Sequence, residues 1–308
     1  MIFIDCKTIL DVVTIFSTDS RCIKHLEHIR WKGNVISPFD ASSTVYKSKN
    51  NRYKCRNTNK YFNVRTGTIF EDSKIPLTKW FMAIYLALSD KKGISSYQLS
   101  RYISVTQKTA WFMLHRIRMA CTDGSVDVMS GMVEVDESYI GGRLKNKHYR
   151  ERKRIREAGI DNKTPVVGIL ERGKNVRATA VKTVDTETVL PILYSTISSE
   201  VSLTSDGAKI YEGLHKLIFQ HVVVNHAAGE YVRGYFHTNN IENFWSHLKR
   251  GITGRYHSVS PKHLQRYLDE FTFRHNTRKL NNGERFSKYL SQSMVRLKYK
   301  DLVGLKTE

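Results

Sequence analysis

Cysteine is scarce in this sequence, and long apolar runs are missing from it. The four cysteines show no pairwise spacing: Cys6, Cys22, Cys55 and Cys121. This scatter gives no support to a disulfide framework and predicts a reducing compartment. No stretch of about eighteen apolar residues occurs, so we expect no membrane span. Residues 1–5 carry no basic segment, and we therefore expect no secretory signal.

The sequence also lacks several motifs that identify large enzyme classes. It contains no serine-nucleophile elbow, no Walker phosphate loop and no dinucleotide fingerprint. The pair Gly141-Gly142 indicates only a turn. Serine hydrolysis, P-loop nucleotide binding and dinucleotide binding therefore have no support in the sequence.

Acidic residues are the minority charge, and basic residues dominate. Fifty Lys and Arg stand against 29 Asp and Glu, which gives a net charge of +21. Because the basic residues cluster, we expect a nucleic-acid partner rather than a generally basic surface. With 308 residues, 40% hydrophobic content, 16 Tyr and 13 Phe, the chain suits two or three domains with real cores.

Residues 1–75 are expected to form a small first unit. Polar turns separate two strand-like pieces, Ser43–Lys47 and Lys60–Val64, and this pattern predicts two small hairpins. Such a unit buries little apolar surface and usually needs a bound metal for stability.

Between residue 77 and about residue 120 the periodicity becomes helical. Residues 80–88 are typical of a buried helix, and two further helices are predicted at 94–103 and 106–118. A short break at Ser104-Val105 separates them, and Ser104 or Thr106 can cap the second. The pair resembles a helix-turn-helix, with an ordinary helical hairpin as the alternative. The candidate DNA-reading positions are Thr106, Gln107, Lys108 and Thr109.

From about residue 128 the pattern changes to strands. We predict strands at 132–139, 165–171, 176–184, 200–205 and 221–225. A helix capped by Asp185 is expected to run through Ile197, and later helices at about 239–251 and 261–277. Ser260 is the expected N-cap of the last one, with Pro261 at its first position. This order predicts an α/β fold, a mixed sheet with helices on its faces.

A strongly basic insertion lies between the first two of these strands. Residues 143–157 hold eight Lys or Arg and two Glu. The neutral interpretation is a solvated, mobile loop. Beside an acidic metal site, such a charge would meet a nucleic-acid backbone, so we also predict a phosphate clamp. Its candidate contacts are Arg143, Lys145, Lys147, Arg150, Arg152, Lys153 and Arg154.

Three acidic residues stand out on this basic chain. Asp136 lies within the strand predicted at 132–139, Asp206 follows the one predicted at 200–205, and Glu242 lies in the helix predicted at 239–251. Phosphodiester cleavage and strand transfer need an activated nucleophile and a stabilised leaving oxygen, which two Mg²⁺ ions about 4 Å apart can provide. Mg²⁺ prefers hard oxygen ligands. We therefore predict a two-ion Mg²⁺ site, with Mn²⁺ as a possible substitute.

The predicted helix around Glu242 carries an apolar stripe. Glu242 and Lys249 are seven residues apart, so they lie within about 20° of each other around the helix. An acid for the metal and a lysine for phosphate would thus share one border of the buried face. Ordinary surface roles for both remain the alternative. The stripe has helical spacing and consists of Ile241, Phe244, Trp245 and Leu248.

Two glutamates flank Asp136. On a strand, Glu134 shares the face of Asp136, whereas Glu137 points away from it. Glu134 is therefore either an acid that supports the metal site or a buried salt-bridge partner.

Other polar residues compete for supporting roles near Glu242. Asn239 and Asn240 precede it by one turn or less, and their amide oxygens can bind Mg²⁺ weakly. His226 and His237 flank the link into this helix. Structural roles are favoured for both histidines over orienting a water or a phosphate.

Taken jointly, these motifs resemble those of the ISXO-like bacterial insertion-sequence transposases, a group related to eukaryotic Merlin elements. Residues 134–142 resemble the first-aspartate motif, residues 205–207 the second, and residues 237–250 the third. The likeness continues through 256–260, 264–271 and 274–276. It covers about residues 20–280.

The resemblance implies a ribonuclease-H-like catalytic core with DDE chemistry. Transposases of this group cut at element ends and join the freed 3′-hydroxyls to target DNA. By motif match, Asp136, Asp206 and Glu242 are the catalytic metal ligands, and Lys249 is an accessory contact to a base pair or phosphate. Some members of the group carry Asn in place of the third acid.

The same resemblance implies an N-terminal zinc ribbon with two Cys-x-x-Cys pairs, and here the chain departs from the group. The pairs align with Ser37 and Asp40, and with Cys55 and Thr58. One thiolate and one carboxylate hold structural zinc poorly. We therefore predict no zinc and a ribbon-like fold that is metal-free or loosely ordered.

These observations predict four segments. They are a degenerate zinc-ribbon-like unit at 1–75, a helix-turn-helix region at 76–122, a ribonuclease-H-like DDE transposase domain at 123–280 and a helical tail at 281–308. The predicted protein is a Mg²⁺-dependent transposase that binds terminal inverted repeats and target DNA as a homo-oligomer. Its expected location is the bacterial cytoplasm, at the nucleoid. The alternatives are a non-catalytic DNA-binding protein derived from a transposase and a ribonuclease-H-like nuclease.

Overall fold

The chain folds into two units, each with its own sheet or helical core. The computed structural model describes residues 6–122, 127–142, 144–157, 162–206, 209–211, 220–224 and 228–304. The first unit is Met1–Cys121 with Thr277–Glu308, and the second is Thr122–Asn276. Arg143 and His226 lie outside the described residues.

The first unit begins with two helices that the strand-and-turn interpretation of residues 1–75 missed. Helix α1 (Ile9–Ile15) starts with a capping box formed by Thr8 and Asp11. Helix α2 (Asp19–Trp31) starts at Thr18, whose hydroxyl accepts the backbone N–H of Arg21. These caps satisfy N–H groups that the first turn of a helix leaves without partners.

A three-stranded antiparallel sheet follows α2. It contains β1 (Val45–Lys47), β2 (Tyr53–Cys55) and β3 (Tyr61–Phe62) in the order β1-β2-β3, which gives the two hairpins predicted for this region. Its inner face packs on α2. There the ring of Trp31 lies 5.1 Å from that of Tyr53, which stacks at 5.7 Å on Phe62. These aromatic contacts hold the small sheet on the helix.

Among the positions at which the resemblance implies zinc-ribbon cysteines, Cys55 is the last residue of β2. The Ser37 hydroxyl accepts the backbone N–H groups of Phe39 and Asp40 at 3.2 and 3.4 Å, so this turn is closed by an oxygen. Burial raises the pKa of the Cys55 thiol, but hydrogen bonds from Ser37, Ser43 and Thr58 outweigh it and lower the pKa to about 6.

Three helices form the core of the first unit. They are α3 (Leu77–Ser89), α4 (Ser96–Ile103) and α5 (Gln107–Met119). Between α4 and α5 the chain turns through Ser104, which adopts a left-handed conformation with φ of 50°. Thr106 caps α5. The helices agree with the predicted pattern.

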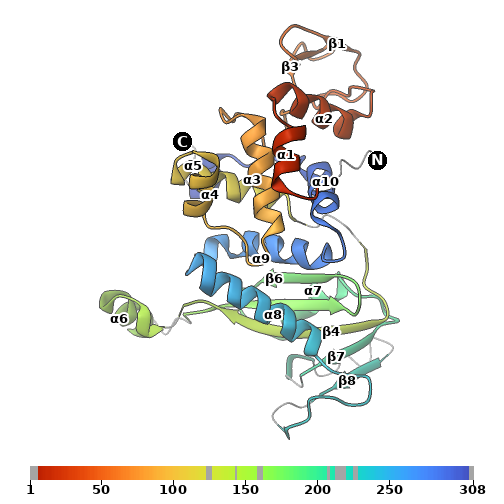
Figure 1. Ribbon diagram of the computed structural model, residues 1–308. Helices are drawn as coiled ribbons and strands as arrows, with labels where there is room; N and C mark the ends of the chain where they lie inside the picture. Colours follow the sequence, from red (N-terminus) through yellow and green to blue (C-terminus); the bar gives the residue numbers. More distant parts are fainter. Residues whose placement is uncertain are drawn as a thin grey trace. The chain divides into compact units, whose positions relative to one another are not determined.

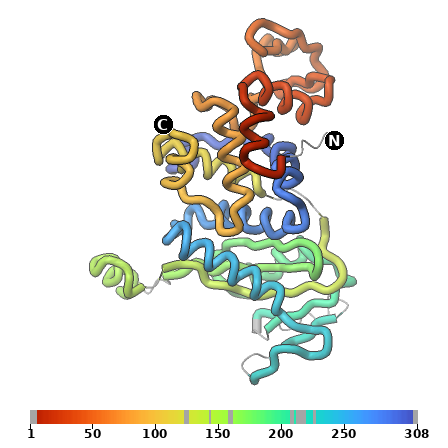
Figure 2. Tube along the Cα trace, viewed as in Figure 1, coloured from red at the N-terminus to blue at the C-terminus, as the bar shows by residue number. Residues whose placement is uncertain are grey.

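The C-terminal segment completes this unit, and Figure 2 shows its blue trace among the N-terminal helices. It forms α10 (Asn282–Gln292) and α11 (Tyr299–Val303). The Tyr289 hydroxyl donates to the carbonyl of Ile117 at 3.0 Å, and buried Arg116 donates to the carbonyls of Ile69 and Leu297. The C-terminal segment therefore belongs to the same core as the helices of residues 1–121.

The second unit is built on a five-stranded mixed sheet (Figure 1). Strands β4 (Met132–Ile140), β5 (Thr164–Glu171) and β6 (Val176–Ala180) are antiparallel neighbours. Strands β7 (Ser202–Ser205) and β8 (Gln220–Val223) run parallel to β4, and the sheet order is β6-β5-β4-β7-β8. The α/β class and the mixed sheet follow the sequence prediction, with shorter β6 and β7.

Helices cover both faces of this sheet. On one face α7 (Thr186–Tyr194) packs through Val189 and Leu193 on residues of β4, β5 and β7. On the other face lie α8 (Asn239–Gly251) and α9 (Pro261–Asn276). The predicted stripe of α8 is buried there, and its members are Ile241, Phe244, Trp245 and Leu248. Five residues in π-helical conformation, Ile252–Tyr256, follow α8.

The described part of the basic insertion is helical, so the prediction of a loop was wrong there. A 3-10 turn at Leu144–Asn146 precedes α6 (Tyr149–Glu157), which stands away from the sheet in Figure 1. Ion pairs between Glu151 and Arg154 and between Lys153 and Glu157 lie along it and favour the helix. None of the described helices has the length and apolar character needed to cross a membrane.

Candidate metal centre

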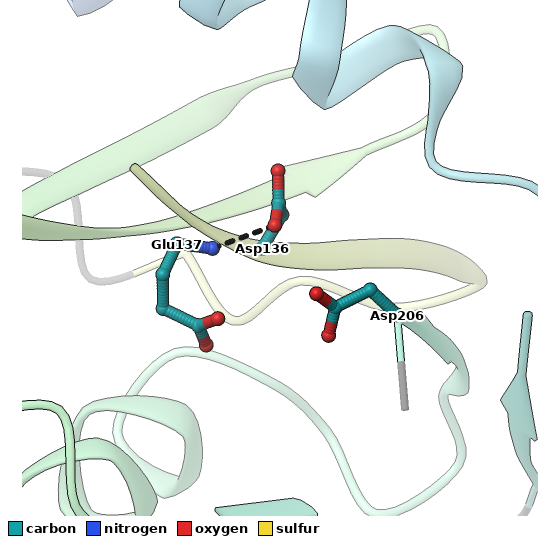
Figure 3. A group of neighbouring side chains, drawn as sticks. All are labelled: Asp136, Glu137 and Asp206. Atoms are coloured by element: carbon teal, nitrogen blue, oxygen red, sulfur yellow. Dashed lines mark hydrogen bonds between the residues drawn. The ribbon is translucent and has the colours of Figure 1, made fainter. Parts of the chain in front are cut away.

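Three carboxylates meet beside β4. One oxygen from each of Asp136, Glu137 and Asp206 lies within 4.8 Å of the others, and all three side chains are half-buried. Figure 3 shows Asp136 and Glu137 pointing to opposite sides of β4, with Asp206 directed toward both. Among the described residues this group does not include Glu242.

The end of β7 explains how Asp136 and Glu137, which are consecutive on β4, can both lie close to Asp206. In the parallel pair β4–β7 the last partners are Glu134 and Thr204, and β7 ends at Ser205. Asp206 therefore follows the last strand residue, beside the part of β4 that carries Asp136 and Glu137. Because Asp206 lies just past the last residue of β7, strand alternation does not confine it to one face, and its carboxylate reaches those of both Asp136 and Glu137.

The position of Asp136 is fixed from α8. The indole Nε1 of Trp245 donates to Asp136 Oδ2 at 3.0 Å, and the backbone N–H of Glu137 donates to Oδ1 at 2.8 Å. Across the β4–β5 ladder Asp136 faces Gly168. A Cβ at Gly168 would lie 2.4 Å from the Trp245 ring. Only glycine leaves room there for the indole that orients the carboxylate.

Burial and mutual repulsion make this group electrostatically unfavourable when no cation is bound. Burial, followed by the charge of Asp206, raises the pKa of Asp136 to about 6. The same two causes, with the Asp136 charge third, raise the pKa of Glu137 to about 8. A divalent cation would relieve both, because opposite charge favours the ionised form. The donor set, three hard carboxylate oxygens, suits Mg²⁺ or Mn²⁺.

A polar network supports Glu137 on the α7 face of the sheet. Tyr211, in the short 3-10 segment Lys209–Tyr211, donates its hydroxyl proton to Glu137 Oε1. The Tyr211 ring lies 6.4 Å from that of His221 on β8, in an edge-on arrangement. His221 Nε2 is 2.8 Å from the hydroxyl of Ser205, the residue before Asp206. These contacts run from the Glu137 carboxylate to Ser205, the last residue of β7.

Glu242 lies in the first turn of α8 and is exposed. Its Oε1 accepts the hydroxyl proton of Thr238 at 3.0 Å. Its charge contributes to the raised pKa of Asp136, so it lies close enough to act electrostatically on the group. Lys249 is exposed in the last turn of the same helix.

Glu134 joins α8 to β4. Its fully buried carboxylate pairs with Arg172 at 2.7 Å. Its Oε2 accepts the backbone N–H groups of Asn240 and Ile241, both at 3.0 Å, and Oε1 accepts the Asn240 amide at 2.7 Å. Of the two roles left open for Glu134, the structure shows the buried salt bridge, to which it adds a cap for α8.

His237 has a structural environment. Its Nδ1 lies 3.5 Å from Glu134 Oε1, and its backbone carbonyl accepts from Arg172 at 2.8 Å. Arg172 also donates to the carbonyl of Tyr235. The link into α8 is therefore held at two successive points by one arginine.

The candidate reading positions at the start of α5 differ in their exposure. Thr106 and Thr109 bond to each other in the cap, and Gln107 donates to the hydroxyl of Ser96 on α4 at 2.8 Å. Lys108 is exposed, with its ammonium 5.3 Å from the centre of the Tyr299 ring.

The described basic candidates of the insertion lie on or just before α6. Lys145, Arg150, Lys153 and Arg154 are exposed, and Lys147 and Arg152 are partly buried. Since α6 stands away from the sheet, its exposed basic side chains do not pack against the sheet that carries Asp136 and Glu137.

Several residues of the site were missed by sequence reasoning. Strand alternation placed Glu137 on the far face, but Asp206, just past the end of β7, lies within reach of its carboxylate. Trp245 was assigned to packing only, although a buried indole N–H needs an acceptor and Asp136 was a candidate. The role of Arg172 had no sequence signal.

Comparisons with known proteins identify relatives. The family model described as ISXO2-like transposase domain matches residues 128–276. An uncharacterized protein in transposable element ISH50 of Halobacterium salinarum is 29% identical over 275 residues, 85% of this chain and 92% of that protein. An uncharacterized transposase-like protein of Haemophilus influenzae is 26% identical over 107 residues, 35% of this chain and 85% of that protein.

Among solved structures, the pre-cleavage Mos1 transpososome matches at 12% identity. The match covers 94% of this chain and 98% of that one, with a TM-score of 0.21. A TM-score this low does not establish a common fold.

Proposed function

We propose that this protein is a DNA transposase that cleaves and joins strands with divalent metal, since residues 128–276 match the ISXO2-like transposase domain model and two relatives are transposable-element or transposase-like proteins. The observation that carries the proposal is the meeting of Asp136 with Asp206, which lie 70 residues apart, within a three-carboxylate group of the matched segment. A basic chain that gathers acid at one point is suited to hold a cation beside DNA.

The metal ligands in this proposal are Asp136 and Asp206, with Glu242 as the third acid of the DDE set. Glu137 is a further oxygen donor on the opposite side of β4. When bound, two Mg²⁺ ions, or Mn²⁺ in their place, would activate the attacking oxygen and stabilise the leaving one. The donor set fits such ions because it consists of oxygens whose repulsion is unrelieved, as the raised pKa values of Asp136 and Glu137 indicate.

The protein's own residues position the reacting groups. Trp245 and the Glu137 amide fix both oxygens of Asp136, so its orientation does not depend on the substrate. Glu134 and Arg172 fix the start of α8 on β4 and hence the position of Glu242. Lys249, on the exposed border of α8, would contact a phosphate of the DNA.

DNA binding is assigned to basic segments of both units. In the second unit, Lys145 to Arg154 on the insertion would clamp the phosphate backbone, and Arg143 extends this set in sequence. In the first unit, α4 and α5 would act as the helix-turn-helix at residues 76–122, with exposed Lys108 among its candidates. Residues 1–75 would act as a zinc-free ribbon. The substrates would be terminal inverted repeats and target DNA, bound by a homo-oligomer.

The sheet order supports the ribonuclease-H-like assignment for residues 123–280. Three antiparallel strands precede two parallel ones, and the acids lie at the central strand β4 and at the end of its neighbour β7. The C-terminal residues 281–308 form the proposed helical tail.

The test is a strand-transfer assay with pre-cut element ends, taken from the inverted repeats that flank the gene. We expect Mg²⁺-dependent joining by the wild type and its loss in Asp136→Asn. Activity that persists in Asp136→Asn would end the catalytic assignment. Products cut but never covalently joined would identify a nuclease, and salt-sensitive DNA binding without Mg²⁺-dependent nicking would identify a non-catalytic DNA-binding protein.

A further inference from the structure

The outer face of the three-stranded sheet carries a row of two tyrosines and a lysine. In the β1–β2 pair Tyr46 stands opposite Lys54, and in the β2–β3 pair Lys54 stands opposite Tyr61. The three side chains therefore lie on one face, on three adjacent strands, with strand spacings of about 4.8 Å.

This row faces solvent. Tyr46 is 50% exposed and Tyr61 54% exposed, while Tyr53, Cys55 and Phe62 are buried on the inner face. The Lys54 ammonium lies 5.8 Å from the centre of the Tyr61 ring, within the range of a cation–π contact. The inner face is fixed on α2 by its aromatic contacts, so the tyrosines stand on a rigid support.

The segment that forms the row carries charge of one sign, and an acid bonded to it, Asp40, lies outside the segment and accepts from the Asn57 amide at 2.7 Å. Residues 45–62 contain six basic residues and no Asp or Glu: Lys47, Lys49, Arg52, Lys54, Arg56 and Lys60. All of these except the partly buried Lys54 are exposed. A second contact of the same kind lies nearby, where the Lys60 ammonium is 5.3 Å from the Phe39 ring. The complementary partner is therefore a polyanion with flat, apolar faces.

We propose that this face, Tyr46–Lys54–Tyr61, binds an unpaired DNA strand by stacking bases on the two tyrosines while the surrounding lysines and arginines contact its phosphates. Duplex DNA hides its base faces within the helix, so it meets only the charge of this surface. An unpaired strand exposes those faces, and each stacked base contributes a sequence-tolerant gain. The inference does not depend on the carboxylate site, because it requires neither metal nor catalysis.

The test is fluorescence anisotropy with the full chain in EDTA, using a labelled single strand of about ten nucleotides and a duplex of the same sequence. We expect Tyr46→Ala and Tyr61→Ala each to weaken single-strand binding by about fivefold or more, and duplex binding by less than about twofold. Tyr46→Phe and Tyr61→Phe keep the rings and should retain single-strand binding. Tyr194→Ala, which removes an exposed tyrosine of the second unit (47% exposed), is the matched control.

A measurement on the unaltered chain removes any dependence on the folding of variants. Photocrosslinking of a single strand that carries bromodeoxyuridine, followed by peptide mapping, should label Tyr46 or Tyr61. Crosslinks confined to other segments would overturn the proposal. So would equal losses for single strand and duplex in the alanine variants, since such losses would indicate a surface that acts through charge alone.

Discussion

Replacing Glu137 by glutamine should stabilise the protein when no divalent metal is present. The substitution keeps the size of the side chain and removes one of three charges that repel each other beside β4. In the folded protein burial and the neighbouring carboxylates raise the pKa of Glu137 from 4.5 to about 8. Keeping this side chain ionised at alkaline pH therefore costs folding free energy.

The sign of the pH dependence follows from proton binding. Between pH 4.5 and about pH 8 the folded state holds a proton on Glu137 that the unfolded state has lost. Stability of the wild type therefore falls as pH rises through this window. Glutamine does not titrate. The gain in folding stability from Glu137→Gln is therefore absent below pH 4.5 and complete above about pH 8.

The magnitude can be estimated from the same values. At about 1.4 kcal/mol per pH unit the full shift corresponds to about 5 kcal/mol. Glu137 is half-buried, and solvent screening reduces this figure, so we expect a gain of about 2 kcal/mol. For a unit of this size that gain raises the midpoint of thermal unfolding by about 5 °C.

The assay is thermal unfolding in EDTA at pH 5 and at pH 9, repeated with saturating Mg²⁺. The advantage of Glu137→Gln should appear only in EDTA at the higher pH and should shrink or reverse with Mg²⁺, because bound metal stabilises the wild type. Exposed Glu200→Gln is the control and should change nothing. If the variant were less stable than the wild type in alkaline EDTA, the ionised Glu137 carboxylate would be stabilised by its surroundings. The proposed repulsion among the three carboxylates would then be wrong.

The remaining predictions concern the supports of the site and the basic helix. Gly168→Ala should cost about 1–3 kcal/mol in chemical denaturation, because its Cβ would meet the ring of Trp245 at 2.4 Å, whereas Gly254→Ala, with open space around its Cβ, should be tolerated. Trp245→Phe removes the donor to the metal-site carboxylate and should weaken Mn²⁺ binding about tenfold in a calorimetric titration. Glu134→Ala leaves partly buried Arg172 without its anionic partner and two backbone amides of α8 without their acceptor, so we expect a loss of about 3–5 kcal/mol of stability and no strand transfer. Arg152→Gln should reduce the slope of log affinity for duplex DNA against log salt by roughly 0.9, and an unchanged slope would exclude a phosphate contact.

In the second unit, the sequence predicted strands and buried helix faces correctly where the apolar periodicity was strong. The apolar run of β5 and the stripe of α8 both specify burial, and the structure confirms the strand and the buried face. The stripe also implied the orientation of Glu242, which lies on its exposed border.

Prediction was weaker where the outcome depends on a neighbouring element. Alternation along β4 assigns Glu137 to the far face, and this holds for the strand by itself. Asp206 follows directly after β7, which ends where the sequence predicted, and from there it lies within reach of the Glu137 carboxylate; no pattern in β4 contains that information.

Composition was misleading at three helices. The charge of residues 143–157 favoured a loop, yet the run from Tyr149 has no glycine or proline and has charge pairs at helical spacing. In residues 9–31 β-branched and polar residues hid α1 and α2, although the caps at Thr8 and Thr18 are visible in the sequence. Cap signals deserved more weight there than average propensity.

The end of β7 at Ser205 also has a consequence for protein design. A ladder that continued past Ser205 would fill the edge of β4 with backbone and keep the two sides of the sheet apart. A design that copies Asp136, Glu137 and Asp206 onto another scaffold would therefore also need a neighbouring strand that ends at the same position. On an uninterrupted sheet, Asp136 and Glu137 would lie on opposite faces, and one aspartate could not reach both.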